Sequence, residues 1–77
     1  MEIEIITFGR ITEFISNQRI SIPGLEDTDE LKAYLESSFP LLAETRYKLA
    51  LNRSIVQATC QIKNNDTVAI MPPFSGG

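Results

Sequence analysis

The chain has 77 residues, of which 43% are hydrophobic and 22% are charged, a composition that supports one small hydrophobic core and leaves no room for a second, catalytic domain. A formal charge of -3 and seven scattered Lys and Arg residues argue against nucleic-acid binding, which needs a concentrated basic surface. Histidine is absent, which removes the commonest general base and the commonest metal ligand. We therefore expect no metal site, and any chemistry must use a less usual group.

Two strands are predicted in the first part of the chain. Residues 2–8 begin with alternating polar and apolar side chains and are rich in β-branched types, which favours a strand that Gly9 then breaks. Residues 11–15 form a helical turn or a loop, and residues 18–22 alternate again as a second strand that Pro23 ends. Because the two strands are so close in sequence, we expect them to pair antiparallel.

A helix is predicted next. Four acidic residues between positions 26 and 30 crowd the place where the N–H groups and the dipole of a helix N-terminus favour negative charge. Asp27 and Glu30 have the spacing of a capping box, and Pro40 ends the helix after Phe39. We expect the helix to cover one face of a sheet, with Tyr34 and Phe39 as core contacts. Its mostly apolar stripe is Leu31, Tyr34, Leu35 and Ser38.

Three further strands are predicted in the second half of the chain. Residues 47–52 and 54–56 form two of them, on either side of a turn at Asn52-Arg53. A second turn, at residues 64–66, leads into the last strand, residues 67–71. Two prolines follow it and end its hydrogen bonding, because proline cannot donate an N–H.

This order of strand, strand, helix and further strands is typical of the α+β class. It fits a β-grasp, or ubiquitin-like, fold, in which a mixed sheet packs on one main helix. We expect residues 1–71 to form the β-grasp domain and residues 72–77 to form a projecting C-terminal tail with a diglycine end.

The tail has properties that suit insertion into another protein. Its pair of prolines holds the chain extended and stiff, and Phe74 offers an apolar anchor that is hard to bury within the domain. Gly76 and Gly77 have no side chains, so they can enter a narrow channel. We expect Pro73 and Phe74 to be interface anchors, and Ser75 and Gly76 to lie in the part of the tail that enters partner active sites.

The carboxylate of Gly77 is the expected working group. A carboxylate is a poor electrophile until a good leaving group replaces its oxygen, for instance after adenylation by ATP, and sulfur can then displace AMP to leave a thiocarboxylate. In that form the sulfur is a soft nucleophile that a host enzyme can use. A simpler explanation is that Gly76-Gly77 is a loose end or a processing scar. The strand, the prolines and the aromatic residue before the glycines favour function instead.

Residues 65–77 run through a turn, a strand, two prolines, an aromatic residue, Ser75 and Gly76-Gly77. This segment resembles the end of the small subunit of molybdopterin synthase, the MoaD family of sulfur carriers. Residues 50–56, where an asparagine separates two short strands, are also similar to that family, and the resemblance extends over nearly the whole chain. It implies a non-catalytic sulfur-carrier subunit of a sulfurtransferase in molybdenum cofactor biosynthesis.

The resemblance also implies partners. An E1-like adenylating enzyme would activate Gly77 with ATP and magnesium, and a sulfur donor of the cysteine desulfurase or rhodanese type would convert it to the thiocarboxylate. The large subunit of the synthase would then take in the tail, supply the acid and base groups, and pass the sulfur to a pterin precursor to build the dithiolene of molybdopterin. No cofactor would be bound permanently.

One departure from the family pattern follows the first strand. Family members often carry Arg-Glu followed closely by Gly, whereas this chain has Thr12-Glu13 and then Ser16. If the arginine helps to dock the large subunit, Thr12 alters that contact.

The lone cysteine, Cys60, cannot form an internal disulfide, which suits a reducing compartment. We expect it to be a small buried or half-buried apolar side chain rather than a persulfide carrier. The acidic residues at 26–30 are expected to cap the helix rather than to meet a basic partner. Neither a basic leader nor an apolar run of membrane-spanning length is present, so we expect a cytoplasmic protein without membrane contact.

Three other functions stay open from the sequence. A carrier for another product, such as the thiazole of thiamine, would share the fold and the diglycine. A protein modifier would join Gly77 to a target lysine, and a β-grasp interaction module would not need the last two glycines. The Pro-Pro-Phe-Ser segment favours the molybdopterin branch, and nothing in the sequence separates molybdenum from tungsten.

Overall fold

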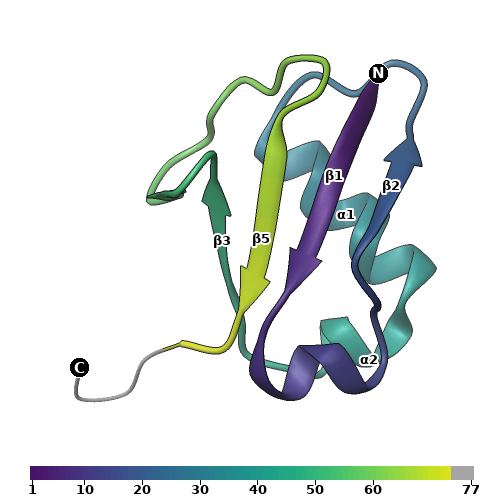
Figure 1. The fold of residues 1–77 in the computed structure, drawn as a ribbon, viewed down its shortest axis with the longest axis vertical. Coiled ribbons are helices and arrows are strands. Elements are labelled where there is room, and N and C mark those ends of the chain that lie inside the picture. The colour runs from purple at the N-terminus through teal and green to yellow at the C-terminus, as the bar shows by residue number, and fades with distance from the viewer. Residues whose placement is uncertain (74–77) are drawn as a thin grey trace.

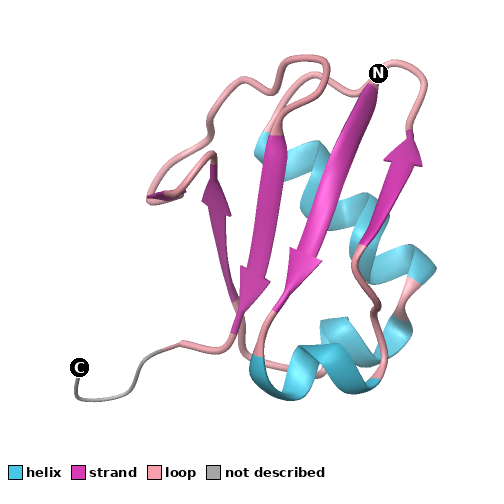
Figure 2. Ribbon diagram, viewed as in Figure 1, coloured by secondary structure: helices cyan, strands magenta, loops and turns pink. Residues whose placement is uncertain are grey.

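The computed structural model describes residues 1–73 and shows a five-stranded mixed sheet with the main helix behind it (Figures 1 and 2). In spatial order the strands are β2 (Gln18–Ser21), β1 (Glu2–Thr7), β5 (Thr67–Met71), β3 (Lys48–Leu51) and β4 (Ser54–Ile55). The helical elements are the 3-10 helix η1 (Gly9–Glu13), the main helix α1 (Thr28–Ser38) and the short helix α2 (Pro40–Ala43). This architecture confirms the predicted α+β class and β-grasp fold.

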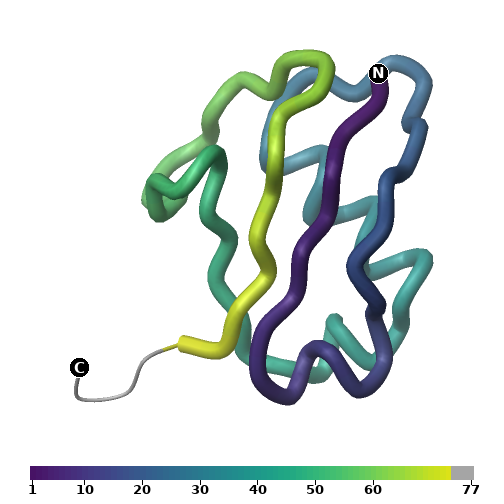
Figure 3. The backbone as a smooth tube through the Cα atoms, in the orientation of Figure 1, coloured from purple at the N-terminus to yellow at the C-terminus, as the bar shows by residue number. Residues whose placement is uncertain are grey.

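The centre of the sheet is the parallel pair of β1 and β5, in which Ile5 lies beside Val68 and Thr7 beside Ile70. β2 pairs antiparallel with β1, as predicted for strands close in sequence. β3 pairs antiparallel with both β5 and β4. Because β1 and β5 run in the same direction, the chain leaves the sheet next to the end of its first strand (Figure 3).

Turns with left-handed backbone join the strands where the sequence predicted them. Asn52 and Arg53 have φ angles of 48° and 76° and connect β3 to β4, and Asn65 has a φ of 70° before β5. Asparagine adopts this region more readily than most residues. The Asn52 side chain also accepts the N–H of Thr67 at 2.9 Å and donates to Asp66 at 3.0 Å. The β3–β4 turn is thereby fastened to the start of β5.

Helix α1 begins at the predicted acidic segment. The Asp27 side chain accepts the N–H of Glu30 at 2.8 Å, and the Glu30 carboxylate accepts the N–H of Glu26 at 2.8 Å. The pair works as a capping box displaced by one residue, since Glu30 reaches the residue before the N-cap. The helix ends at Ser38, one residue before the predicted Phe39, which is its C-cap. Pro40 also begins α2, which the sequence pattern does not predict.

One hydrophobic core fills the space between the sheet and α1. Alternation along the strands directs Ile3 and Ile5 of β1 and Val68 and Ile70 of β5 into it. Five fully buried apolar side chains of the core come from the helices and from η1 with the loop after it: Ile11, Ile15, Leu31, Leu35 and Leu42. The core therefore holds both the end of β1 and the end of β5 in place.

Of the two aromatic residues predicted as core contacts of the helix, one is partly buried against the core and the other is exposed. Phe39 is partly buried and packs against the core, which confirms the prediction. Tyr34 is 38% exposed, so its prediction is wrong. Leu31 and Leu35, one turn apart, are fully buried in the core, whereas Tyr34 and Ser38, at the edge of the apolar stripe, are exposed.

Two neighbouring substitutions test this placement. Leu35→Ala is expected to lower the free energy of unfolding by about 2–5 kcal/mol, because it leaves a cavity where a side chain with 0% exposure had packed. Tyr34→Ala is expected to cost clearly less than Leu35→Ala, since the Tyr34 side chain is 38% exposed and leaves no closed cavity when it is shortened. Urea unfolding followed by circular dichroism measures both, and equal losses would contradict the surface position of Tyr34.

Candidate functional site

The root of the tail is the part of the predicted site that the structure describes. Pro72 and Pro73 follow β5 directly and are half-buried. They line a hollow of about 340 Å³ together with residues of η1 and of the segment after α2: Arg10, Ile11, Glu44, Thr45 and Arg46. Phe74, Ser75, Gly76 and Gly77 lie outside the described residues, so their predicted roles stay predictions.

A groove of about 550 Å³ crosses the open face of the sheet, the face opposite α1. Its apolar walls come from four strands and from the residue after β1: Ile6, Phe8, Ala50, Ile55, Ala69 and Met71. Phe8 is 49% exposed and Ile55 is 44% exposed, although both are large apolar side chains. An exposed apolar hollow of this kind is typical of an interaction surface.

The groove has a simple origin in the strand register. Ile6 lies beside Ala69, Ala69 beside Ala50, and Ala50 beside Ile55, so the four side chains form one row across the sheet. The two central members are alanines and the two outer members are isoleucines. A row with small residues in the middle and large residues at its ends is hollow at its centre.

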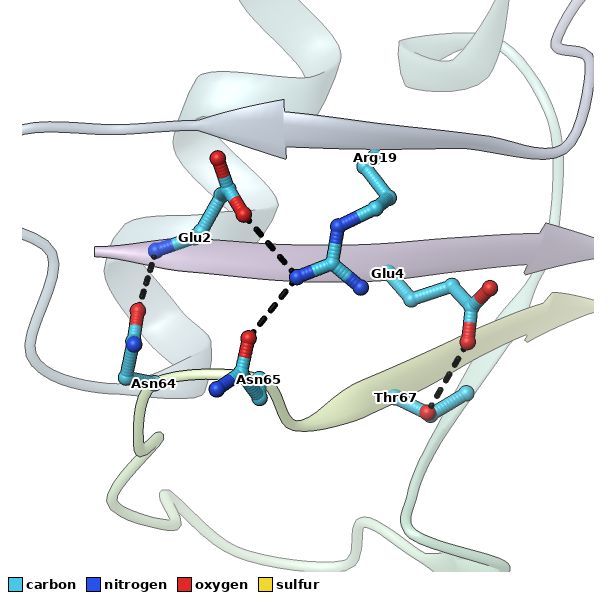
Figure 4. A network of polar contacts seen from close by, with 6 residues as sticks. All are labelled: Glu2, Glu4, Arg19, Asn64, Asn65 and Thr67. Atoms are coloured by element: carbon cyan, nitrogen blue, oxygen red, sulfur yellow. Dashed lines mark hydrogen bonds and ion pairs between the residues drawn. The ribbon is translucent and has the colours of Figure 1, made fainter.

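A polar network occupies the other end of the same face (Figure 4). The guanidinium of Arg19, on β2, donates to the carboxylate of Glu2 at 3.0 Å and to the side chain of Asn65 at 2.8 Å. The hydroxyl of Thr67 donates to Glu4 at 3.4 Å. The open face is therefore polar where β1 begins and apolar where β1 and β5 end, beside the tail.

Strand alternation carries the signal that would have found the groove. Ile3, Ile5 and Thr7 are buried toward α1, so Ile6 and Phe8 must point the other way. The alternation within residues 2–8 therefore indicates apolar side chains on the second face of the strand. The contact of Ile6 with Ala69 and Ala50 has no such local signal, because it depends on the order of the strands in the sheet.

Cys60 has the half-buried position that was predicted for it. Its backbone N–H donates to the hydroxyl of Thr28 at 3.0 Å, and its carbonyl accepts the N–H of Thr28 at 2.9 Å. These two bonds fasten the loop before β5 to the first residue of α1. The surroundings of Cys60 thus match the predicted packing role.

Thr12, which stands where the family often has arginine, lies in η1 and is exposed. Its hydroxyl donates to the carbonyl of Gly9 at 2.7 Å. A short side chain at this position therefore stabilises the turn after β1.

Among residues 1–73, no cluster of cysteine and acidic side chains could hold a metal ion. Within the same range, no helix has the length and apolar character that crossing a bilayer requires.

Among the described titratable groups, Tyr47 has the most clearly shifted pKa. It precedes β3, is half-buried, and donates its hydroxyl hydrogen bond to the carboxylate of Glu36 on α1. Burial is the largest cause that raises the pKa of the Tyr47 phenol, and the hydrogen bond to Glu36 and its negative charge add to it. The Lys32 ammonium also lies 5.8 Å from the centre of the Tyr47 ring. The group links α1 to β3 on the side of the sheet away from the groove.

The fold and this surface define a ubiquitin-like protein with an apolar groove beside the root of a diglycine tail. The model of the ThiS family matches residues 5–77, and the chain belongs to that family. The family resemblance drawn from residues 65–77 is thereby confirmed.

Individual relatives agree with this assignment. The chain is 31% identical over 81 residues to the molybdopterin synthase sulfur carrier subunit of Arabidopsis thaliana, a match that covers 100% of this chain and 84% of the relative. A chain of the complex of subunits 1 and 2 of the molybdopterin-converting factor from Helicobacter pylori is similar in structure, with a TM-score of 0.74, 28% identity and complete coverage of both chains.

A third similarity concerns the fold alone. A protein described as subunit 1 of a molybdopterin converting factor from Pyrococcus furiosus has a TM-score of 0.84 with 16% identity, over 95% of this chain and 98% of its own. The β-grasp architecture is thus shared at low sequence identity.

Tyr47→Phe is expected to change how stability depends on alkaline pH. The folded chain keeps the phenol proton above pH 10, where an unfolded chain with the ordinary pKa of 10.0 has begun to release it. The unfolded state then binds fewer protons, so the free energy of unfolding falls as pH rises through the unfolded pKa. Urea unfolding from about pH 8 to about pH 11 should show a steeper fall for the parent than for Tyr47→Phe. Identical slopes would contradict the raised pKa.

Proposed function

We propose that this chain is the sulfur carrier subunit of a molybdopterin synthase and that the Gly77 carboxylate carries the sulfur. The observation behind the proposal is a family match that runs through Gly77, joined by a full-length relative that is a molybdopterin synthase sulfur carrier subunit. Members of this sulfur-carrier family are non-catalytic small subunits. The reaction therefore takes place in the active sites of partner proteins.

The proposed cycle has three steps. An E1-like enzyme, using ATP and magnesium, joins the Gly77 carboxylate to AMP and releases pyrophosphate. A sulfur donor of the cysteine desulfurase or rhodanese type presents its sulfur as a persulfide, whose outer sulfur attacks the acyl carbon of Gly77 and displaces AMP to form an acyl disulfide. A thiol then attacks the donor's sulfur in this disulfide, releases the Gly77 thiocarboxylate and is itself oxidised to a disulfide with the donor. The large subunit transfers the sulfur to a pterin precursor for the dithiolene of molybdopterin, and water supplies the oxygen that returns Gly77 to a carboxylate.

The groove on the open face is the proposed docking surface for the large subunit. The groove runs from the β3–β4 turn and Thr67 to the ends of β1 and β5, so a partner that covers Phe8 and Met71 also meets Pro72 and Pro73. Large exposed apolar side chains in a hollow are the usual centres of binding energy. The Helicobacter pylori relative, found in a complex of subunits 1 and 2, supports the pairing of this chain with a large subunit.

The alternative functions predict different chemistry for the C-terminal tail. A carrier for thiamine thiazole would use the same thiocarboxylate, and the molybdopterin relatives favour the other product. A protein modifier would yield a lysine-linked conjugate of Gly77. An interaction module would keep its function after deletion of Gly76 and Gly77.

Intact mass spectrometry tests the carrier function. The chain is incubated with ATP, magnesium, the activating enzyme and a sulfur donor, and it is expected to gain the mass difference of one oxygen replaced by sulfur, located at Gly77. A chain that lacks Gly77 serves as the control and should gain nothing. An unchanged mass for the full chain, with a known carrier reacting in the same mixture, would rule out sulfur transfer.

Phe8→Asp tests the docking surface. It is expected to weaken binding of the large subunit by at least about tenfold, because it places a charge in the apolar groove. Leu41→Asp is the matched control: it adds the same charge at a side chain that is 56% exposed on α2, outside the groove. Titration calorimetry measures both affinities. Equal weakening by the two variants would move the docking surface away from the open face.

A further inference from the structure

Gly9 and Pro72 meet where the first strand ends and the tail begins. Gly9 has a φ of +59°, in the left-handed region that favours glycine. A Cβ added there would lie 2.7 Å from Cγ of Pro72 and 3.2 Å from its Cδ, closer than the ordinary contact range of 3.4–4 Å. The Pro72 ring therefore fills the space that a side chain at position 9 would need.

The backbone around Gly9 is held on both sides. The N–H of Phe8 donates to the carbonyl of Ile70 at 3.1 Å, which extends the β1–β5 pairing to the residue before Gly9. The Thr12 hydroxyl donates to the carbonyl of Gly9 at 2.7 Å. Pro72 has no N–H with which to anchor itself. A side chain at position 9 would accordingly displace Pro72 rather than the turn.

We propose that Gly9 is a positioning residue for sulfur transfer. Its bare backbone is the surface on which the Pro72 ring packs, and this contact sets the direction in which the chain leaves the sheet. The inference rests on the proposed carrier function, since the direction of the tail matters only if Gly77 must reach a partner's active site. Gly9 itself touches no substrate.

A small displacement at Pro72 has a large effect because the root of the tail is stiff. Pro72 and Pro73 both have a fixed φ, so a rotation of the first ring is passed on to the second instead of being absorbed. Gly77 follows only five positions after Pro72. When reacting groups must align, a misplacement of about 1 Å can cost on the order of 100-fold in rate.

The test compares Gly9→Ala with Gly24→Ala. Gly24 also has a positive φ, +76°, but a Cβ there would meet nothing within 4 Å, so its substitution adds the backbone strain without the contact. Sulfur loading of the full-length chains by the activating enzyme and donor gives kcat and KM for the carrier, measured well below the melting temperature of each variant. We expect Gly9→Ala to lower kcat/KM by roughly tenfold and Gly24→Ala to match the parent.

Pro72→Ala provides an independent readout, because it removes the Cγ and Cδ atoms that the new Cβ would strike. In the parent chain this substitution is expected to lower kcat/KM. In the Gly9→Ala chain it is expected to raise kcat/KM toward the parent value. Such a change of sign is a direct coupling between the two residues, which general destabilisation would not produce.

In the activity measurements, the proposal is overturned by equal losses in Gly9→Ala and Gly24→Ala, or by no gain when Pro72→Ala is added to Gly9→Ala. If Gly9→Ala fails to fold and the double variant folds, the contact is supported, whereas failure of both overturns a positioning role. A parent chain that takes up no sulfur would instead disprove the carrier function. The contact is then tested alone by NMR, where nuclear Overhauser effects between Gly9 and the Pro72 ring are expected in the parent and in Gly24→Ala, and their absence from the parent would overturn it.

Discussion

The parallel pairing of β1 with β5 is the constraint on which the rest of the structure depends. It places the first and last strands of the chain side by side at the centre of the sheet, with Ile5 beside Val68 and Thr7 beside Ile70. A parallel pair cannot be closed by a tight turn, so the chain between the two strands has to cross over, and α1 in this segment covers one face of the sheet. Because the pair is parallel, both strands end at the same end of the sheet. The turn at Gly9, the root of the tail and the apolar end of the open face are neighbours for that reason.

Sequence reasoning reached most of the fold because its signals are local. The last strand was predicted at residues 67–71, as observed, since a turn precedes it and two prolines follow it. The start of α1 followed from acidic residues that cap it. Tyr34 and α2 were misjudged, because a residue at the edge of an apolar stripe and a single helical turn after a proline depend on packing that no local pattern records.

One part of the candidate site could be predicted from the sequence, and the other part could not. The diglycine and the two prolines are visible in the sequence as a run of special residues. The groove is not, because Ala50 and Ala69 become neighbours only when β3 and β5 pair, and Ile6 joins them only through β1. The contact of Gly9 with Pro72 likewise needs the strand order before it can be foreseen. A surface built by residues distant in sequence can be identified only from the structure, whereas a chemical group on one short segment can be identified from the sequence.

The direction of β1 and β5 also fixes how the domain bears mechanical force. Because the strands are parallel, β1 starts at one end of the sheet and β5 finishes at the other (Figure 1). A pull applied between Met1 and the tail would slide the two central strands past each other along their length. The hydrogen bonds of the pair would then share the load instead of opening one after another. The tail can be drawn into a partner while the domain behind it resists being pulled apart.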